Sequence, residues 1–219
     1  MADATPPSRT RSQEKRRAIL QAAQEVFLSQ GYLGTNMDLV ASRSGVSKQT
    51  VYAHFGNKEA LFIEIVTSMT DAAGDRVHHD RPDLVDEAVL EIYLRDYAER
   101  QLLTVMQPSL LQLRRLVIGE VARFPDLARV LYERGPRRAI TQIAQTFDTL
   151  RERGLLRADD AEAAAEWFNW LVMAAPLNRA MMLGDAAVPG RDELRRHAAE
   201  AVRIFLVAFG AAPGRPALP

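Results

Sequence analysis

Residues 35–62 read TNMDLVASRSGVSKQTVYAHFGNKEALF, and this stretch decides the fold class of the chain. Thr35 followed by Asp38 is a capping pair that predicts the start of a short helix. Gly45 permits the left-handed backbone that ends such a helix, and Ser47 is a good N-cap for the next one. Two short helices joined by a glycine turn form a helix-turn-helix, whose second helix can enter a DNA major groove.

The second of these helices is predicted to be polar on its outer face. Val46 and Val51 are expected to face inward, which leaves Lys48, Gln49 and Thr50 at the front of the helix. Glutamine can make two hydrogen bonds to adenine, lysine can donate to guanine, and the threonine methyl can pack on thymine. The alternative is that these side chains form only a solvated face.

This stretch resembles the TetR family of bacterial regulators. The residues that carry the resemblance are Thr35, Ala41, Gly45-Val46-Ser47, Tyr52-Ala53-His54-Phe55 and Lys58-Glu59-Ala60-Leu61-Phe62. Ser44 and Asn57 depart from the usual residues of the pattern, but asparagine caps a helix as well as serine does. The match covers roughly residues 10–65.

The resemblance implies that Tyr52 and His54 bind DNA phosphates. Lys58 lies at the start of the next helix, where free N–H groups favour a phosphate, and we expect the same of Thr35. Arg9, Arg11, Lys15 and Arg16 form a basic cluster that could reach the DNA backbone or a minor groove, or could serve only solubility. The predicted DNA-contacting residues are Arg11, Thr35, Ser47, Lys48, Gln49, Thr50, Tyr52, His54 and Lys58.

Charge is distributed unevenly along the chain, although 28 basic residues balance 28 acidic ones. Residues 1–60 hold eight basic and five acidic side chains, and all the lysines lie there. The remaining residues hold 20 basic and 23 acidic side chains (28 less 8, and 28 less 5). A basic head on an acidic body is typical of a DNA-binding protein.

Several classes of protein find no support in the sequence. The absence of cysteine excludes disulfides and thiolate chemistry. We expect no cofactor and no metal, because His78-His79-Asp80 has no spaced partner. No grouping of nucleophile, base and orienter can be assembled, so we do not expect an enzyme. The N-terminus lacks the apolar core of a signal peptide and no run is long enough to span a membrane, so a soluble cytoplasmic protein is expected.

The hydrophobic periodicity predicts an all-α fold of about nine helices, with a three-helix DNA-binding domain and a larger helical bundle. The expected domains are a basic arm over 1–9, the helix-turn-helix domain over 10–56, the bundle over 57–209 and a tail over 210–219. The expected helices have the following approximate bounds. They run from Thr10 or Ser12 to Ser29, from Asn57 to Gly74, from Asp83 to Met106, from Pro108 to Arg123, from Pro125 to Arg153, from Asp159 or Asp160 to Met181, and from Arg191 to Phe209. Gly135-Pro136 is expected to kink or split one helix, and Pro176 to bend another.

The second region resembles the AefR-like C-terminal domain of the TetR family. The resemblance rests on Gly119-Glu120-Val121-Ala122-Arg123-Phe124-Pro125, on Leu131-Tyr132-Glu133-Arg134-Gly135-Pro136 and on Gly154-Leu155-Leu156. It implies a pocket for a small molecule among the helices of the body. Candidate lining residues are Tyr93, Tyr97, Met106, Arg114, Phe147, Trp167, Asn169, Trp170 and Met173. For each of these residues the alternative is plain core packing.

The last two predicted helices carry more apolar surface than a small body needs. In proteins of this family, such helices pack against their twins in a four-helix dimer interface. The predicted interface residues are Trp170, Met181, Leu194, Val202, Phe205 and Phe209, and burial within one chain is the alternative.

These observations predict a homodimeric regulator, most often a repressor in this family, that binds a partly palindromic DNA site and is released by an apolar small molecule. Two other classes stay open. One is an all-helical enzyme or carrier of apolar ligands with a vestigial helix-turn-helix. The other is a DNA-organising protein without a ligand, whose body serves only to dimerise.

Overall fold

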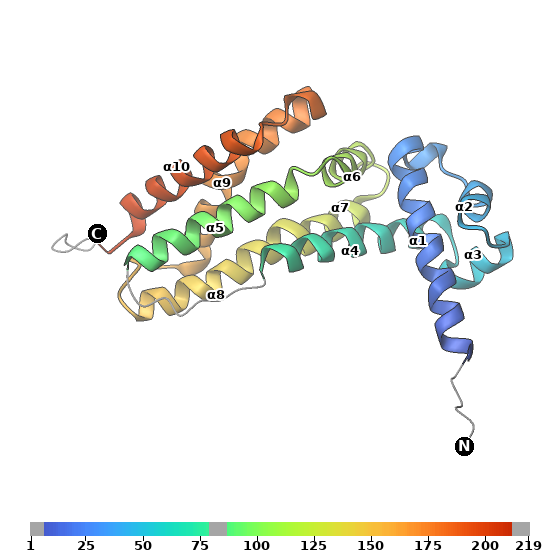
Figure 1. Ribbon diagram of the computed structural model, residues 1–219, viewed down its shortest axis with the longest axis horizontal. Coiled ribbons are helices and arrows are strands. Elements are labelled where there is room, and N and C mark those ends of the chain that lie inside the picture. Colours follow the sequence, from blue (N-terminus) through green and yellow to red (C-terminus); the bar gives the residue numbers. More distant parts are fainter. Residues whose placement is uncertain (1–6, 79–86, 212–219) are drawn as a thin grey trace, which may run out of the picture. The chain divides into compact units, whose positions relative to one another are not determined.

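The computed structural model describes residues 7–78 and 87–211, and it confirms the all-α prediction for them (Figure 1). One isolated β-bridge, between Leu156 and Gly210, is the sole extended pairing within those ranges. The helices are α1 (Pro7–Gly34), α2 (Met37–Ser44), α3 (Lys48–Phe55), α4 (Lys58–Val77), α5 (Glu87–Val105), α6 (Pro108–Gly119), α7 (Pro125–Tyr132), α8 (Arg138–Glu152), α9 (Ala161–Leu183) and α10 (Arg191–Phe209). Glu133–Arg137 forms a π-helical segment, and Asp185–Ala187 forms a 3-10 turn. No helix among the described residues is long and apolar enough to cross a membrane.

Four predicted helix boundaries are wrong, and the predicted start near Asp83 lies outside the described residues. The first helix was expected to end near Ser29, but α1 continues to Gly34 across a kink at Gly31. The first helix begins at Pro7, because proline has a preset φ and needs no hydrogen bond at the first helical position. The helix that was expected to end at Gly74 continues to Val77, and α6 ends at Gly119 rather than near Arg123. Gly74 lies inside α4, and a Cβ there would come within 2.9 Å of a guanidinium nitrogen of Arg138, the far end of a flexible side chain that can shift.

The chain folds into two compact units. The first contains Met1–Met69 and Gln112–Leu131, and the second contains Thr70–Leu111 and Tyr132–Pro219. The expected boundary between residues 56 and 57 therefore lies inside the first unit, because the first half of α4 packs with the helix-turn-helix. Part of α6 and nearly all of α7 join the same unit.

An aromatic cluster holds the first unit together. The ring centroids of Phe27 and Phe62 lie 4.7 Å apart, and the ring of Tyr32 lies 5.2 Å from that of Phe62. Phe124, from the turn before α7, lies 4.5 Å from Tyr32. Gly31 leaves the helical conformation with a φ of 72°, which turns the end of α1 and directs Tyr32 into this cluster. Such aromatic pairs stabilise a fold beyond the area they bury.

The second unit is a helical bundle in which α10 packs against α5 and α9, and α9 packs against α8 (Figure 1). Three fully buried phenylalanines fill its centre. Phe168 of α9 lies 5.7 Å from Phe147 of α8 and 5.1 Å from Phe205 of α10, both at edge-to-face angles. Asp160 caps α9 by accepting hydrogen bonds from the backbone N–H groups of Glu162 and Ala163. Of the two caps predicted, Asp159 and Asp160, the second is therefore the one used.

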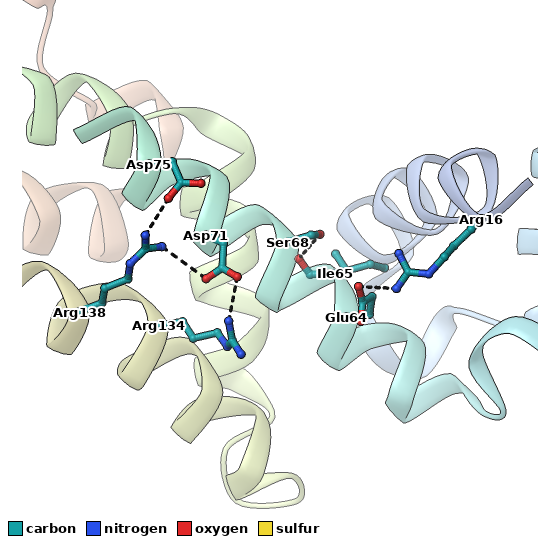
Figure 2. A network of polar contacts seen from close by, with 8 residues as sticks. All are labelled: Arg16, Glu64, Ile65, Ser68, Asp71, Asp75, Arg134 and Arg138. Carbon is teal, nitrogen blue, oxygen red and sulfur yellow. Dashed lines mark hydrogen bonds and ion pairs between the residues drawn. The ribbon is translucent and has the colours of Figure 1, made fainter. Parts of the chain in front are cut away.

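Ion pairs join α4 to the π-helical segment and α8 within the second unit (Figure 2). Arg134 Nη1 lies 2.8 Å from Asp71 Oδ2, and Arg138 Nη2 lies 2.7 Å from Asp75 Oδ1. Gly135 and Pro136 occur in the π-helical segment, so the prediction that they split this helix is confirmed. The irregular turn places Arg134 and Arg138 where both reach the carboxylate of Asp71, Arg138 at 3.6 Å.

Candidate nucleic-acid interface and effector site

The helix-turn-helix is capped by a residue other than the expected one. Asn36 is the N-cap of α2, and its side chain accepts a hydrogen bond of 2.7 Å from Leu39 N. Thr35 is 2% exposed, and its hydroxyl donates to Gly31 O at 2.7 Å. This corrects the assignment of Thr35 to a cap and to a phosphate contact, because its hydroxyl instead stabilises the turned end of α1.

The turn and the start of α3 match the prediction. Gly45 adopts the left-handed conformation, with a φ of 67° and a ψ of 23°, and it ends α2. Ser47 caps α3 by accepting from Thr50 N, and its Oγ also lies 2.8 Å from Thr50 Oγ1. Ser47 therefore preorganises the first turn of α3 and orients the hydroxyl of Thr50. Val51 is fully buried against the supporting helices, and Val46 is half-buried.

The front of α3 is exposed within its unit. Lys48, Gln49 and Tyr52 are exposed, while Thr50 and His54 are half-buried. The Lys48 ammonium group forms an ion pair with Asp38 in the first turn of α2, with Nζ lying 2.8 Å from Oδ1. This hydrogen bond raises the pKa of Lys48, so the group is fully charged at neutral pH. Exposed amide, ammonium and phenol groups on one short helix can donate to base edges and phosphates.

Lys58 holds the C-terminal end of α1. Its ammonium group donates to Tyr32 O at 2.9 Å and to Thr35 O at 3.0 Å, and it lies 4.6 Å from the centroid of the Tyr32 ring. Two of its three N–H groups therefore point at the protein, and one is left for a phosphate. The side chain has a structural role that the sequence pattern did not reveal.

The basic cluster at the N-terminus is divided by the fold. Arg11 and Lys15 are exposed on α1. Arg16 forms a 2.6 Å ion pair with Glu64 of α4 (Figure 2). Its guanidinium group also lies over the ring of Phe55. The side chain of Arg9 lies outside the described part of the structure. Arg16 thus connects two helices of the first unit, and Arg11 and Lys15 stay free to face a polyanion.

Most of the predicted pocket residues lie in the interior of the second unit. Buried there are Tyr93, Tyr97, Met106, Phe147, Asn169 and Met173. Trp167 is 63% exposed and Trp170 is 39% exposed, which corrects their assignment to an internal pocket. Arg114 belongs to α6 of the first unit, where burial lowers the pKa of its guanidinium group. Helical phase explains the error, because Phe168 and Asn169 take the inward positions between the two tryptophans.

One interior residue was missed by the sequence reasoning. Gln101 of α5 is 4% exposed, and its Nε2 donates to Asn169 Oδ1 of α9 at 2.8 Å. The available signal was the spacing, since Tyr93, Tyr97 and Gln101 follow one another at intervals of four residues on one face of α5.

Most of the residues predicted for the dimer interface are buried or partly buried within the second unit. Leu194, Val202 and Phe205 are buried in their own bundle, which corrects their assignment to an interface, and Met181 and Phe209 are partly buried against the same core. The exposed apolar residues of α9 and α10 are Trp167, Trp170, Met182, Leu183, Ile204 and Val207. Ile204 and Val207 were missed because the strong inward stripe of α10 dominates its hydrophobic pattern.

No cluster of three or more His, Asp or Glu side chains that could hold a metal occurs within residues 7–78 and 87–211. His79 and Asp80 of the weak metal motif lie outside the described residues.

A short exposed helix, capped by a serine and joined to its supporting helix through a left-handed glycine, is the site of a helix-turn-helix DNA-binding protein. The model for "Bacterial regulatory proteins, tetR family" matches residues 19–65, and the model for "AefR-like transcriptional repressor, C-terminal domain" matches residues 93–211. The chain therefore belongs to the TetR family, and it is a helix-turn-helix transcriptional regulator.

Solved structures share the whole architecture. A TetR-family regulator from Mesorhizobium loti MAFF303099 is 37% identical, with a TM-score of 0.82 over 91% of this chain and 98% of that one. The "Flavonoid-responsive Regulator FrrA" is 32% identical, with a TM-score of 0.76 over 92% of this chain and 98% of that one. Among curated relatives, the regulator YhgD of Bacillus subtilis is 47% identical over 56 residues, which are 26% of this chain. That alignment spans only 29% of YhgD, so it supports the DNA-binding head alone. The relatives are transcriptional regulators and not enzymes.

Proposed function

We propose that this TetR-family regulator acts as a homodimer that binds a partly palindromic operator through α3 and is released by a small molecule bound in the second unit. The contacts proposed for base edges are those of Lys48, Gln49 and Thr50. Tyr52, His54, Arg11 and the remaining N–H of Lys58 are proposed for phosphates. Repression is the expected outcome, because the C-terminal region matches the family of AefR-like transcriptional repressors.

The observation that carries this proposal is the front of α3. Lys48 and Gln49 are exposed at the start of a helix whose inner residue, Val51, is fully buried. The recognition helix is thus fixed by its core while its polar side chains stay accessible. A solvated face would have the same exposure, so mutation of the two side chains is the deciding experiment.

A gel shift with DNA from upstream of the chain's own gene tests the proposal. Lys48→Ala and Gln49→Ala should each weaken specific binding by about 5- to 100-fold, since a good base contact contributes about 1–3 kcal/mol. Arg151→Ala, which changes an arginine on α8 of the second unit, is the matched control. Binding should also fall steeply with salt, as expected for about 6–10 phosphate contacts per dimer. Unchanged binding by both recognition-helix variants would refute the assignment.

Dimerisation is proposed through α9 and α10. The two exposed tryptophans of α9 and the exposed Ile204 and Val207 of α10 are large apolar side chains on neighbouring helices of one unit. Large exposed apolar patches on a protein surface mark interaction sites. A two-fold dimer would present two copies of α3 to half-sites about one DNA turn apart.

Ligand response is proposed as a shift between two populations. A ligand that binds the DNA-incompetent state more tightly, by about 1–3 kcal/mol of coupling, would release the operator. The related regulator FrrA is flavonoid-responsive by name, which supports a small-molecule effector for this chain. Thermal-shift screening tests this point, because a true effector stabilises the folded protein. If a broad library gives no stabilisation, the ligand-free DNA-organising alternative is favoured.

A further inference from the structure

A row of polar groups lies on the inward face of α5 in the second unit. Tyr97 and Gln101 are 2% and 4% exposed, and Arg100 lies between them, one turn after Tyr97. Apolar neighbours such as Leu94 and Leu102 are fully buried around them. A phenol, a guanidinium group and an amide with buried polar atoms within five residues of one helix are unusual in a core, because each polar group needs a partner there.

Three atoms of this row lack that partner. Among the residues that the structure describes, no hydrogen bond is made by the Tyr97 hydroxyl, by Arg100 Nε or by Gln101 Oε1, and all three atoms are buried. Gln101 is held in place by its other atom, since its Nε2 donates to Asn169 Oδ1. The amide of Gln101 is thus oriented with a free acceptor, while Tyr97 and Arg100 supply free donors.

Aromatic rings surround the unpartnered hydroxyl. The ring of Tyr97 has its centroid 5.4 Å from that of His78, 6.0 Å from that of Phe168 and 6.3 Å from that of Tyr93. Burial raises the pKa of Tyr97 well above its ordinary value of 10.0, so the phenol stays protonated and can donate a hydrogen bond. These surroundings favour a flat, uncharged ring that carries polar substituents.

We infer that Tyr97, Arg100 and Gln101 are the polar end of the effector site, and that the effector is an aromatic compound with one hydroxyl and one carbonyl group. The effector hydroxyl donates to Gln101 Oε1, and its carbonyl oxygen accepts from the Tyr97 hydroxyl and Arg100 Nε. This inference rests on the proposed small-molecule response and replaces the apolar effector expected from the sequence. A hydrocarbon would leave all three protein atoms without partners.

Four small probes of similar shape test the chemistry on the full chain, without DNA, by isothermal titration calorimetry. They are 4-hydroxyacetophenone, 4-methylacetophenone, 4-ethylphenol and 4-ethyltoluene, which carry both polar groups, the carbonyl only, the hydroxyl only and neither. We expect the first to bind most tightly. Each missing group should raise Kd by about 3- to 10-fold, the usual worth of a neutral hydrogen bond. Equal affinities, or no binding of any probe up to millimolar concentration, would overturn the inference.

Two variants assign the contacts. Tyr97→Phe should reduce the preference for the carbonyl probes, because only the contact from Arg100 Nε then remains. The double variant Gln101→Met with Asn169→Leu should remove the preference for the hydroxyl probes without leaving an unpaired amide. Tyr132→Phe, which changes an exposed tyrosine of the same unit, is the matched control and should preserve the whole order.

The melting temperature of the free protein separates a ligand site from a site filled by ordered water. Tyr97→Phe removes a hydroxyl that has no protein partner, so the free variant should melt at the same temperature as the wild type or higher. A lower melting temperature would show that water satisfies the hydroxyl, and it would overturn the inference.

Failure of this inference is distinguishable from failure of the proposed function. Operator binding without the predicted order of probe affinities contradicts only the effector chemistry. The predicted order of affinities in a chain that binds no DNA supports the effector site and contradicts the regulator mechanism.

Discussion

Lys48, the first residue of α3, forms an ion pair with Asp38, in the first turn of α2. The lysine proposed to read DNA is therefore held beside a carboxylate when no DNA is bound. Both side chains are largely exposed, so the pair itself adds little stability. Its consequence lies in DNA binding, because Lys48 must leave Asp38 in order to reach a base, and a carboxylate near the groove repels phosphates.

Asp38→Asn should tighten DNA binding while leaving the melting temperature nearly unchanged. Loss of the carboxylate frees Lys48 and removes a negative charge from the interface. We expect a several-fold lower Kd on operator and on random DNA alike, measured by fluorescence anisotropy at fixed salt. Glu200→Gln removes a carboxylate of an exposed ion pair on α10 and serves as the control. Weaker operator binding by Asp38→Asn would instead show that Asp38 positions Lys48 for the contact.

Gly45→Ala should destabilise the first unit. The φ of 67° lies in the left-handed region, where a Cβ costs about 1–2 kcal/mol. A Cβ would meet no atom within 4 Å, so the cost is one of backbone strain and not of a clash. Gly119→Ala is the control, because that glycine also has open space and has no positive φ. Urea unfolding followed by circular dichroism measures the difference, and equal stability of the two variants would contradict the conformational argument.

Lys58→Met should lower stability as well as DNA affinity. It removes two charged hydrogen bonds, to the carbonyl oxygens of Tyr32 and Thr35, and a cation–π contact with the Tyr32 ring. Hydrogen bonds to charged groups contribute about 1.5–3 kcal/mol each when buried, and partial exposure reduces this to a total of about 1–3 kcal/mol. Lys15→Met, at an exposed position of α1, provides the comparison in thermal unfolding. If Lys58 only binds phosphate, both variants will unfold at the wild-type temperature.

Stability should fall as the pH rises above about 10, in part because of Tyr97. Burial raises the pKa of this phenol in the folded state above the value of about 10 that it has in the unfolded chain. At a pH between these two pKa values, the unfolded chain has lost the phenol proton while the folded chain still holds it. Deprotonation therefore favours unfolding, so the free energy of unfolding is unaffected by the titration of Tyr97 below pH 10 and falls as the pH rises above 10. Urea unfolding at pH 9, 10 and 11 should show a shallower decline for Tyr97→Phe than for the wild type. Tyr32, whose pKa burial also raises, accounts for part of the remaining decline.

Trp167→Glu with Trp170→Glu should convert the proposed dimer to a monomer. Both side chains are exposed on α9, and a carboxylate at the centre of an apolar interface would be left without a partner. Light scattering after gel filtration at micromolar concentration measures the mass. Ile92→Glu introduces a charge at a comparably exposed apolar position of α5 and should leave the dimer intact. A double variant that stays dimeric would place the interface elsewhere.

The local features of the helix-turn-helix could be predicted from the sequence because they depend on residues close together in the chain. Gly45 is the residue that tolerates a positive φ, and Ser47 can cap only the helix that follows it. The same local rule predicted the wrong N-cap for α2, because Thr35 and Asn36 can both cap a helix. Asn36 is the cap because the Thr35 hydroxyl instead donates to the carbonyl oxygen of Gly31, where the backbone of α1 turns.

The all-α class, the positions of most helices and the exposed polar face of α3 could be predicted from the amino-acid sequence, because periodicity and capping are local properties. Which face of each helix is buried in the core depends on packing between helices that are distant in the chain, so it became known from the structure. Trp167 and Trp170 face outward while Asn169 between them is buried, because Gln101 of a distant helix meets it with a hydrogen bond. The tertiary structure also decided that Phe124 belongs with the DNA-binding head, through its contact with Tyr32. Such pairings join residues far apart in the chain, and the free energy of burying them together leaves no signal in either segment alone.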